Sequence, residues 1–348
     1  MKIGIIAPLW KPVPPDGYGG TELIVSNITE ELVRRGHDVT LFASGDSKTD
    51  ARLVPITEKN LHSLLGGFDW KELSYDILQA ERVATMSEEF SIVHNHNGFV
   101  PLAFTPFIKT PMITTLHSSL PPEPRILSEA FKDRYFVSIS NAQRSLAPYL
   151  NYIRTVYHGI KVEDFPFSDK DKGYLLFIGT FSPFKGPDIA IEVAKKSGIP
   201  IVLAGERRAE FDEYIKRHIE DREDGEQVII RGELNFDEKA QLLSGAISLL
   251  MPVRWEEAFG LVMVEAMACG TPVIGFRRGS IPEIIEDGKT GFVVENTDEM
   301  INSIKKIKNI SRAFCRETAE NKFSVKRMVD DYERLYEEVK DRTGCASH

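Results

Sequence analysis

Two carboxylates stand out in the sequence because of their surroundings. Glu257 and Glu265 lie in one run, residues 254–272, which joins a polar segment to an apolar one. From Leu261 to Cys269 every residue except Glu265 is apolar or small, so we expect a buried helix that carries one carboxylate inside the protein. A buried carboxylate that is ionised and unpaired is costly. Glu265 should therefore meet an internal cation or a ligand rich in hydroxyl groups, such as a ribose.

The start of the same helix suits an anion. The helix is expected to begin just after Gly260 and directly after a strand, where amide groups and the positive end of the helix dipole can receive phosphate without obstruction by a Cβ atom. Glu257 then lies in the loop beside this position. Two carboxylates flanking an anion site match a nucleoside diphosphate sugar. Alternatively, Glu265 pairs with an arginine in the core and Gly260 only makes a turn, and spacing alone does not separate these interpretations.

Residues 254–272 resemble the signature of the retaining glycosyltransferases of family 4, the glycosyl transferases group 1, which have the GT-B fold. Glu257 and Glu265 match the two glutamates of the E-x7-E motif of that family. Similar identities surround them in Phe259-Gly260-Leu261, Glu265-Ala266-Met267 and Gly270-Thr271-Pro272. The resemblance implies that Glu257 contacts hydroxyls of the donor sugar, that backbone amides of Phe259, Gly260 and Leu261 approach sugar and phosphate, and that Glu265 holds the ribose.

A glycine-rich loop near the start of the chain, residues 17–22, resembles the first glycine-rich loop of the family. The resemblance implies that the backbone of Gly19 or Gly20 approaches the diphosphate and that Glu22 faces the acceptor. Taken without the resemblance, these glycines indicate a tight turn before a helix.

Three histidines follow predicted strands. His117 ends the strand predicted at residues 111–116 and resembles the family histidine that contacts the donor sugar near the reacting carbon, although a lone histidine at this position is often structural. His94 and His96 alternate at another strand end, a pattern that can indicate a metal. No carboxylate or cysteine nearby completes a ligand set, and the GT-B fold works without a metal, so we predict neither metal nor cofactor. We assign His96, with Asn97 as the alternative, to the acceptor side.

Lys185 matches the family lysine that neutralises the leaving diphosphate. At one position the chain departs from the family, because Thr180 stands where an arginine usually follows the glycine of that strand. Arg207 or Arg208, after another predicted strand, could supply the second cation. The alternative is that both arginines are solvated residues at the start of a helix.

The elements that position these residues follow an alternating pattern of Val-rich and Ile-rich strands with helices, which is typical of parallel sheets in α/β domains. Strands are predicted at residues 2–7, 38–43, 91–94, 111–116, 135–139, 154–157, 174–178, 200–204, 227–231, 246–251, 272–276 and 291–294. The clearest helices are predicted at residues 21–35 and 324–340.

A polar stretch at residues 162–172 predicts a linker. We therefore expect an acceptor-side domain over residues 1–163, a nucleotide-sugar-binding domain over 164–323, and a C-terminal helix and tail over 324–348. The resemblance implies two Rossmann-like domains that face each other across a cleft, with the final helix returning to the first domain.

Composition limits the functions that remain. A net charge of −9 argues against a general nucleic-acid-binding role. The three cysteines, Cys269, Cys315 and Cys345, are odd in number and widely spaced, which suits free thiols in a reducing cytoplasm. The apolar start of the chain is interpreted as a first strand rather than a signal peptide. No apolar run is long enough to span a bilayer.

The sequence and its resemblance to family 4 together imply a cytoplasmic, metal-independent, retaining glycosyltransferase. It would transfer a hexosyl unit from a nucleotide sugar, with UDP or GDP as the carrier, to a carbohydrate, lipid or small-molecule hydroxyl. Weak peripheral contact with a membrane is compatible with this prediction. The alternatives are a non-catalytic nucleotide-sugar-binding protein and a GT-B phosphorylase or epimerase. A nicotinamide dehydrogenase is disfavoured because Gly17, Gly19 and Gly20 do not complete the G-x-G-x-x-G motif.

Overall fold

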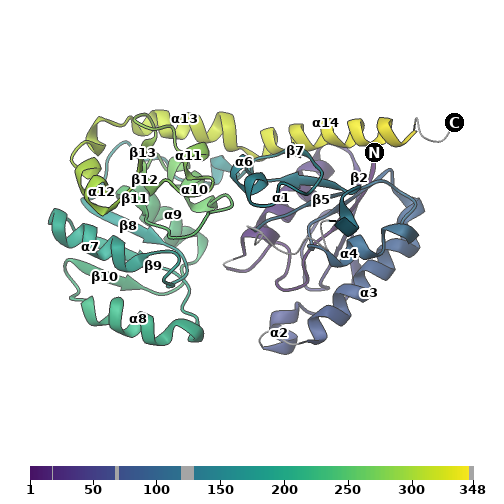
Figure 1. The fold of residues 1–348 in the computed structure, drawn as a ribbon, viewed down its shortest axis with the longest axis horizontal. Coiled ribbons are helices and arrows are strands. Elements are labelled where there is room, and N and C mark those ends of the chain that lie inside the picture. The colour runs from purple at the N-terminus through teal and green to yellow at the C-terminus, as the bar shows by residue number, and fades with distance from the viewer. Residues whose placement is uncertain (18, 67–69, 119–128, 345–348) are drawn as a thin grey trace. The chain divides into compact units, whose positions relative to one another are not determined.

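A computed structural model describes residues 1–17, 19–66, 70–118 and 129–344 of the protein (Figure 1). The chain divides into two compact units. Unit 1 consists of Met1–Gly159 together with Val325–His348, and unit 2 consists of Ile160–Ser324. Among the described residues, no helix combines the length and the apolar character that crossing a membrane requires.

The described part of unit 1 contains a seven-stranded parallel sheet with the order β3-β2-β1-β4-β5-β6-β7. Its strands are β1 (Lys2–Ile6), β2 (Asp38–Ala43), β3 (Arg52–Pro55), β4 (Ile92–Asn95), β5 (Met112–Thr115), β6 (Tyr135–Ser138) and β7 (Tyr152–Thr155). The α-helices are α1 (Gly20–Arg34), α2 (Leu61–Leu65), α3 (Lys71–Met86), α4 (Val100–Ala103), α6 (Asn141–Leu146) and α14 (Val325–Gly344). Strand order reverses at β1, so the carboxyl ends of β1 and β4 flank the position where open parallel sheets bind ligands.

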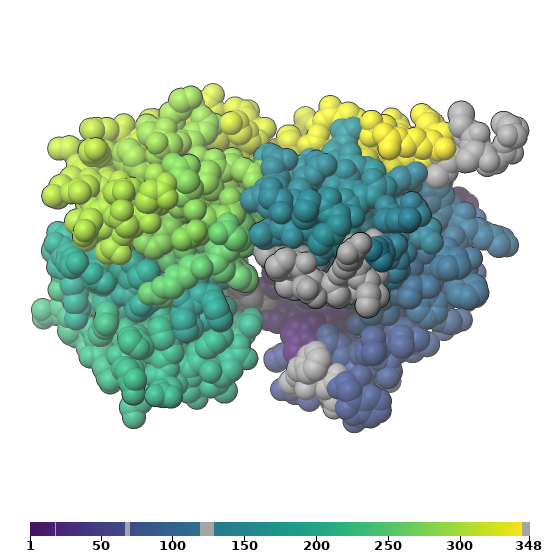
Figure 2. All heavy atoms as spheres, viewed as in Figure 1, coloured from purple at the N-terminus to yellow at the C-terminus, as the bar shows by residue number. Residues whose placement is uncertain are grey.

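The last helix, α14, belongs to unit 1. Its apolar residues recur every three or four positions and face the unit, so that one stripe of the helix is buried. This stripe consists of Val325, Met328, Val329, Tyr332, Leu335, Tyr336 and Val339. Ion pairs Arg35–Asp330 (2.7 Å) and Arg154–Glu338 (2.8 Å) border it. Figure 2 shows α14 in yellow along the surface of unit 1, and the expectation that the final helix returns to the first domain is confirmed.

Unit 2, all of which is described, has a six-stranded parallel sheet with the order β10-β9-β8-β11-β12-β13. Its strands are β8 (Tyr174–Ile178), β9 (Ile201–Ala204), β10 (Val228–Arg231), β11 (Ala246–Met251), β12 (Val273–Phe276) and β13 (Gly291–Val294). The α-helices are α7 (Pro187–Ser197), α8 (Asp212–His218), α9 (Phe236–Gly245), α10 (Leu261–Ala268), α11 (Ile281–Ile284), α12 (Thr297–Ile304) and α13 (Arg312–Phe323). The order reverses at β8, so the loops after β8 and β11 meet at the switch point of this sheet.

The described residues also include short 3-10 helices. They lie at Ser87–Glu89, Thr105–Phe107, Val162–Asp164, Ala209–Phe211, Glu220–Arg222 and Ile307–Asn309.

The predicted α/β class with two Rossmann-like parallel sheets is confirmed, with local corrections. The sequence did not reveal β3, a short edge strand that ends in Pro55, a residue without the amide hydrogen that a longer ladder would use. The strand predicted at 154–157 is observed at Tyr152–Thr155. Helix α10 does not follow a strand directly, because the loop of residues 252–260 separates it from β11. That loop carries Glu257.

Candidate functional site

Glu265 lies in the interior of unit 2 and has a lysine as its partner. Its side chain is 5% exposed, and its Oε1 accepts a hydrogen bond of 2.6 Å from Lys239 Nζ. The lysine comes from α9 and its side chain is 24% exposed, so it reaches the carboxylate from the solvent side. The cation expected for a buried carboxylate is therefore present, as a lysine rather than the arginine considered from the sequence. Burial, with the Glu265 charge as a smaller cause, raises the pKa of the neighbouring Cys269 thiol to about 12.

Glu257 also pairs with a lysine. Its Oε2 accepts 2.6 Å from Lys185 Nζ and 3.1 Å from Trp255 Nε1, while Lys185 Nζ lies 4.5 Å from the centre of the Trp255 ring. Lys185 comes from the loop after β8, and the other two residues come from the loop after β11. These strands are neighbours at the switch point, which explains why residues 72 positions apart meet. Both glutamates of the motif thus hold a lysine ammonium group.

The loop that carries Glu257 is fixed by the segment between β12 and α11. Ser280 N donates to Glu257 O at 2.8 Å, and Ser280 Oγ donates to Phe259 O at 3.0 Å. Gly279 N donates to Glu256 Oε2 at 2.5 Å. Gly279 has φ +53, and a Cβ atom there would lie 2.1 Å from Glu257 O. Only glycine fits this close approach.

Gly260 and its neighbours start α10. Gly260 is the N-cap residue of α10 and has φ +78, a left-handed conformation that favours glycine. Phe259 is buried and packs edge-on against Phe323, with ring centres 6.1 Å apart. Leu261 opens the first turn, where helical amides lack partners within their own helix. The chain therefore presents a helix N-terminus close in sequence to Glu257, as the phosphate hypothesis requires.

The two arginines considered as substitutes at Thr180 differ in their contacts. Glu206 Oε2 accepts both from Thr180 Oγ1 at 3.3 Å and from Arg208 Nε at 2.8 Å. Arg207 instead pairs with Asp212 at 3.0 Å and with Glu220. Of the two guanidinium groups, Arg208 is therefore the one linked to Thr180. Whether either binds a diphosphate stays a prediction.

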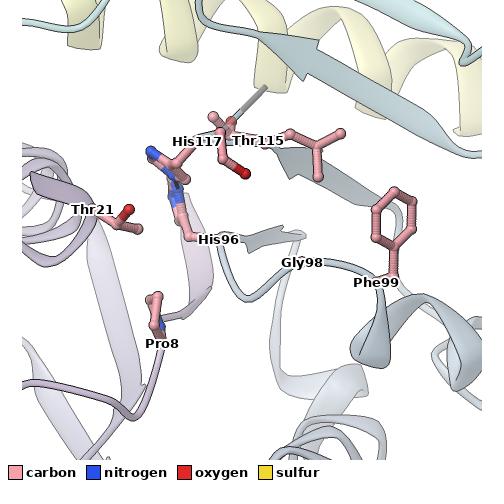
Figure 3. A pocket seen from close by; sticks show the side chains of 9 residues that line it. Pro8, Thr21, His96, Gly98, Phe99, Thr115 and His117 are labelled. Carbon is pink, nitrogen blue, oxygen red and sulfur yellow. Dashed lines mark hydrogen bonds between the residues drawn. The ribbon is translucent and has the colours of Figure 1, made fainter. Parts of the chain in front are cut away.

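Unit 1 contains a pocket at the carboxyl ends of its central strands, with a volume of about 290 Å³ (Figure 3). Its lining residues are Pro8, Thr21, His96, Gly98, Phe99, Thr115, Leu116, His117 and Ser118. Pro8 follows β1, His96 follows β4 and His117 follows β5. The structure thus brings together His96 and His117, which are 21 positions apart.

The imidazole rings of this pocket are coupled. His96 Nδ1 and His117 Nε2 share a hydrogen bond of 2.8 Å, which Figure 3 shows between the two rings. His94 lies next to His96 with ring centres 3.9 Å apart, and His158 stacks on His117 at 5.1 Å. Burial lowers the pKa of His117 to about 3 and that of His96 well below its usual value. These rings are therefore neutral near pH 7.

Two ring nitrogens of this pair have no hydrogen-bond partner within the part of the chain that the structure describes. They are His96 Nε2 and His117 Nδ1, and both are buried. An unsatisfied buried polar group costs about 1–3 kcal/mol. The pocket therefore holds hydrogen-bonding capacity that the described protein does not use.

Beneath the pocket, side chains from α14 complete a polar network that the sequence analysis missed. His94 Nδ1 bonds to Tyr336 Oη at 2.7 Å, and His94 Nε2 bonds to Thr115 Oγ1 at 2.8 Å. Thr115 Oγ1 also lies 3.0 Å from Tyr332 Oη. The one available signal was the spacing of the two tyrosines, four positions apart on a predicted helix and therefore on one face. Nothing in that spacing indicates a histidine partner.

The glycine-rich loop leads into α1, and the second residue of that helix, Thr21, lines the pocket. Gly19 is the N-cap residue of α1 and Gly20 is its first residue, while Tyr18 lies outside the described residues. Glu22 is 6% exposed, and burial raises the pKa of its carboxyl group, partly offset by its own backbone and by Lys11. Like Glu265, it is a buried carboxylate, and its acceptor-side role stays a prediction.

The structure offers no grouping of metal ligands among the described residues: no three His, Cys, Asp or Glu side chains there are arranged to hold an ion. Cys269 and Cys315 are buried free thiols. Cys345 lies outside the described residues.

Comparisons with known proteins identify both units. Residues 161–323 match the family described as Glycosyl transferases group 1, and residues 18–160 match Glycosyltransferase Family 4. An uncharacterized glycosyltransferase of Methanocaldococcus jannaschii is 29% identical over 93% of this chain and 95% of its own. The N-acetyl-alpha-D-glucosaminyl L-malate synthase of Bacillus anthracis is 26% identical over 97% of each chain.

A solved structure shares the fold. The Anabaena protein HepE in complex with UDP and glucose superimposes with a TM-score of 0.75 and 17% identity, covering 97% of this chain and 100% of that one. At this identity the likeness shows the fold alone.

Proposed function

The chain belongs to the family 4 glycosyltransferases, within the glycosyl transferases group 1, and from this premise we propose that it is a retaining enzyme that transfers a hexosyl unit from UDP-sugar to a hydroxyl group. The observation that carries the proposal is the pair of Glu257 and Lys185, 2.6 Å apart, in the two loops that meet at the switch point of the unit 2 sheet, with α10 beginning at the end of the Glu257 loop. Both carboxylates are buried, Glu257 in the loop just before the N-cap residue of α10 and Glu265 on α10 itself. A helix N-terminus beside such carboxylates suits a nucleotide sugar.

Each group in unit 2 receives a role. Glu265 accepts hydrogen bonds from the ribose hydroxyls, and Glu257 accepts them from the hydroxyls of the donor sugar. The backbone amides of Phe259, Gly260 and Leu261 approach the sugar and the phosphates. Lys185 binds the diphosphate, so it must exchange part of its contact with Glu257 for the ligand.

Transfer breaks the bond between the anomeric carbon and a diphosphate oxygen and forms a bond from that carbon to the acceptor oxygen. Negative charge that builds on the diphosphate is met by Lys185 and by the amides near Gly260. The acceptor attacks from the face that the diphosphate leaves, and its proton passes to the released diphosphate. No side chain is assigned as a base. The glutamate pair therefore does not act as the acid and base of a glycosidase.

Unit 1 receives the remaining assignments by resemblance. His117 contacts the donor sugar, His96 and Glu22 belong to the acceptor side, and the backbone of Gly19 and Gly20 approaches the diphosphate. The charge on the diphosphate is neutralised by protein groups, with Arg208 favoured over Arg207 as the second cation because Glu206 links it to Thr180. The proposal calls for no metal and no cofactor. The proposal includes a cytoplasmic location, because the free thiols Cys269 and Cys315 are compatible with a reducing compartment.

The choice of UDP over GDP comes from a protein that shares the fold. HepE, which shares the fold, was solved with UDP and glucose. The relative from Bacillus anthracis is named for an N-acetylglucosaminyl group and for malate, a small-molecule acceptor. We therefore place UDP-glucose and UDP-N-acetylglucosamine first among the donors to be tested.

Two glutamine variants test the proposal. Glu265→Gln is expected to weaken UDP binding about tenfold or more, because a charge-assisted hydrogen bond to the ribose is lost. Glu257→Gln is expected to keep most of the UDP affinity and to reduce sugar transfer. Binding is measured by calorimetry and transfer by UDP release with and without an acceptor extract. Glu226→Gln, at an exposed position, serves as the control. Unchanged affinity and turnover in both variants would refute the assignment.

The same assay separates the main alternative. A non-catalytic nucleotide-sugar-binding protein would bind UDP-sugar without releasing UDP in any acceptor extract. The feature that favours this alternative is Thr180, which stands where the family usually has an arginine.

A further inference from the structure

The indole of Trp255 contacts both members of the Glu257–Lys185 pair. Its Nε1 donates to Glu257 Oε2 at 3.1 Å, and Lys185 Nζ lies 4.5 Å from the centre of its ring. Glu257 Oε2 also accepts from Lys185 Nζ at 2.6 Å. One carboxylate oxygen therefore receives two donors, a neutral N–H and an ammonium group. Glu257 Oε1 accepts no hydrogen bond from the described residues. The two oxygens thus differ, because Oε2 is held by the protein and Oε1 is not.

The two donors on Glu257 Oε2 differ in what the proposed transfer requires of them. Lys185 is assigned to the diphosphate, so its ammonium group exchanges part of its contact with Glu257 when a nucleotide sugar binds. The indole N–H only donates and carries no charge, so a phosphate does not draw it away as strongly. It is free to stay on Oε2 while the ammonium group moves. Because its acceptor is ionised, this hydrogen bond belongs to the stronger class in proteins.

Tryptophan suits this position because it serves both neighbours at once. The face of an indole attracts a cation more strongly than the other aromatic rings do, and the Lys185 ammonium group lies within the usual range of this attraction. A phenylalanine would keep the face but lacks the N–H donor. An arginine would donate to Glu257 but would repel Lys185 by its charge. An indole therefore donates to the carboxylate without expelling the lysine.

The backbone on both sides of Trp255 is held in place. Arg254 N donates to Phe184 O at 2.7 Å, which ties the loop after β11 to the loop after β8. The Arg254 guanidinium donates to both carboxylate oxygens of Asp188, at 2.9 and 2.6 Å. On the other side, Glu256 Oε2 accepts 2.5 Å from a backbone amide of the segment between β12 and α11. The indole is thus attached to a fixed stretch of chain, although its residue is 38% exposed.

We propose that Trp255 is a positioning residue for the donor site: its Nε1–H holds Glu257 Oε2 both in the ligand-free protein and after Lys185 has turned to the diphosphate, and so keeps Glu257 Oε1 directed to the hydroxyls of the sugar. The inference rests on the proposed function, which assigns the sugar to Glu257 and the diphosphate to Lys185. Trp255 acts through Glu257 and needs no contact with the sugar. Its loss should therefore impair transfer more than it impairs the binding of UDP, which has no sugar for Glu257 to meet.

Nitrogen-15 NMR of the full chain measures the hydrogen bond directly through the indole N–H signals. The chain has three tryptophans, so Trp10→Phe and Trp70→Phe identify the signal of Trp255 by elimination. Glu257→Ala should move this signal to lower proton chemical shift, because the carboxylate acceptor is lost. Saturation of the wild type with UDP should leave it nearer to its ligand-free position than to its position in Glu257→Ala. Glu226→Ala, at an exposed glutamate of the same unit, is the control and should not move the signal.

Trp255→Phe removes the donor and keeps an aromatic face beside Lys185. The substrate is UDP-glucose or UDP-N-acetylglucosamine, whichever the wild type transfers faster. The rate of transfer at saturating donor should fall about tenfold, the effect of losing a hydrogen bond to a charged group. The affinity for UDP, measured by calorimetry, should stay close to that of the wild type. Trp70→Phe, at a tryptophan of unit 1 that is 75% exposed, is the matched control and should change neither quantity. A variant that merely folds poorly would lose transfer and UDP binding together.

Three results would overturn the role of Trp255. They are an indole signal that does not respond to Glu257→Ala, a signal that UDP moves to the position seen in that variant, and a Trp255→Phe protein that transfers sugar at the wild-type rate. Failure of the proposed function has a different signature. UDP would then not bind, or no acceptor extract would give transfer, while the indole signal of the ligand-free protein still responded to Glu257→Ala.

Discussion

Lys239 Nζ lies 2.6 Å from Glu265 Oε1, although the two residues are 26 positions apart and belong to different helices. The contact joins α9 to α10 at the one charged position of an otherwise apolar helix. The side chain of Lys239 is 24% exposed and that of Glu265 is 5% exposed. Removing the lysine therefore does not have the same effect as removing the glutamate. Loss of the lysine leaves a charge in the interior, whereas loss of the carboxylate leaves an ammonium group that reaches water.

Lys239→Met should therefore destabilise unit 2 by about 1–3 kcal/mol, less than the loss of a partner in a fully buried pair because water reaches the lysine. Glu265→Gln alone should cost less. The double variant, Lys239→Met with Glu265→Gln, should regain most of the stability that Lys239→Met alone loses. Its UDP affinity should stay as low as that of Glu265→Gln. Urea denaturation and calorimetry measure the two quantities. If Lys239→Met is as stable as the wild type, the lysine does not stabilise the carboxylate.

Gly279→Ala should damage sugar transfer through the loop that carries Glu257. An added Cβ would lie 2.1 Å from Glu257 O, so the loop must shift. We expect a loss of transfer of about tenfold or more, with UDP affinity less affected because Glu265 lies on α10. Gly288→Ala is a matched control, since Gly288 has φ +73 and nothing within 4 Å of the added Cβ. Both variants carry similar backbone strain, of order 1 kcal/mol. Equal transfer rates in the two variants would show that the close approach to Glu257 is unimportant.

Acidification should destabilise unit 1. The pKa of His117 is about 3 in the folded protein, against about 6.5 in an unfolded chain, and burial lowers those of His94 and His96 as well. The unfolded state therefore binds more protons below pH 6.5. The contribution of His117 is complete above that pH and decreases toward pH 3, by up to about 1.4 kcal/mol per pH unit. The contributions of His94 and His96 also decrease as the pH falls.

Urea denaturation between pH 7 and pH 5 measures this effect, before most carboxylates titrate. His117→Asn should show a smaller decrease than the wild type. Glu22 acts in the opposite direction, because burial raises its pKa, so the test is the difference between variant and wild type at each pH. Identical pH dependence in the two proteins would exclude a folding contribution from the neutral state of His117.

The sequence predicted the positions that follow from local pattern. The apolar surroundings of Glu265 indicated its burial, and in the structure its side chain is 5% exposed. The alternation of strands and helices indicated both sheets. Partners could not be predicted in the same way. Lys239 is one of many lysines in the chain, and only the packing of α9 against α10 selects it. From the sequence we considered an arginine as the partner of Glu265, because no local pattern distinguishes one basic residue from another.

The histidine cluster shows the same limit. The alternation of His94 and His96 can indicate a metal, which we did not predict, but it gives no information about the hydrogen bonds from His94 to Thr115 and Tyr336. Tyr336 is 242 positions away from His94. Periodicity along a helix shows which face is buried but not which part of the chain covers it. Short edge strands such as β3 could not be predicted for a related reason, because pairing with a neighbouring strand, rather than their own residues, makes them form.

The place of α14 has a consequence for synthesis on the ribosome. Unit 2 is continuous in the chain, so all its residues emerge before the last helix does. The sheet of unit 1 is translated first, yet His94 has no tyrosine partner until residues 325–344 have left the exit tunnel. The first unit to be made is thus the last to be completed. Nascent chains that stop before Tyr336 should contain a folded unit 2 and an imidazole pocket whose base is missing.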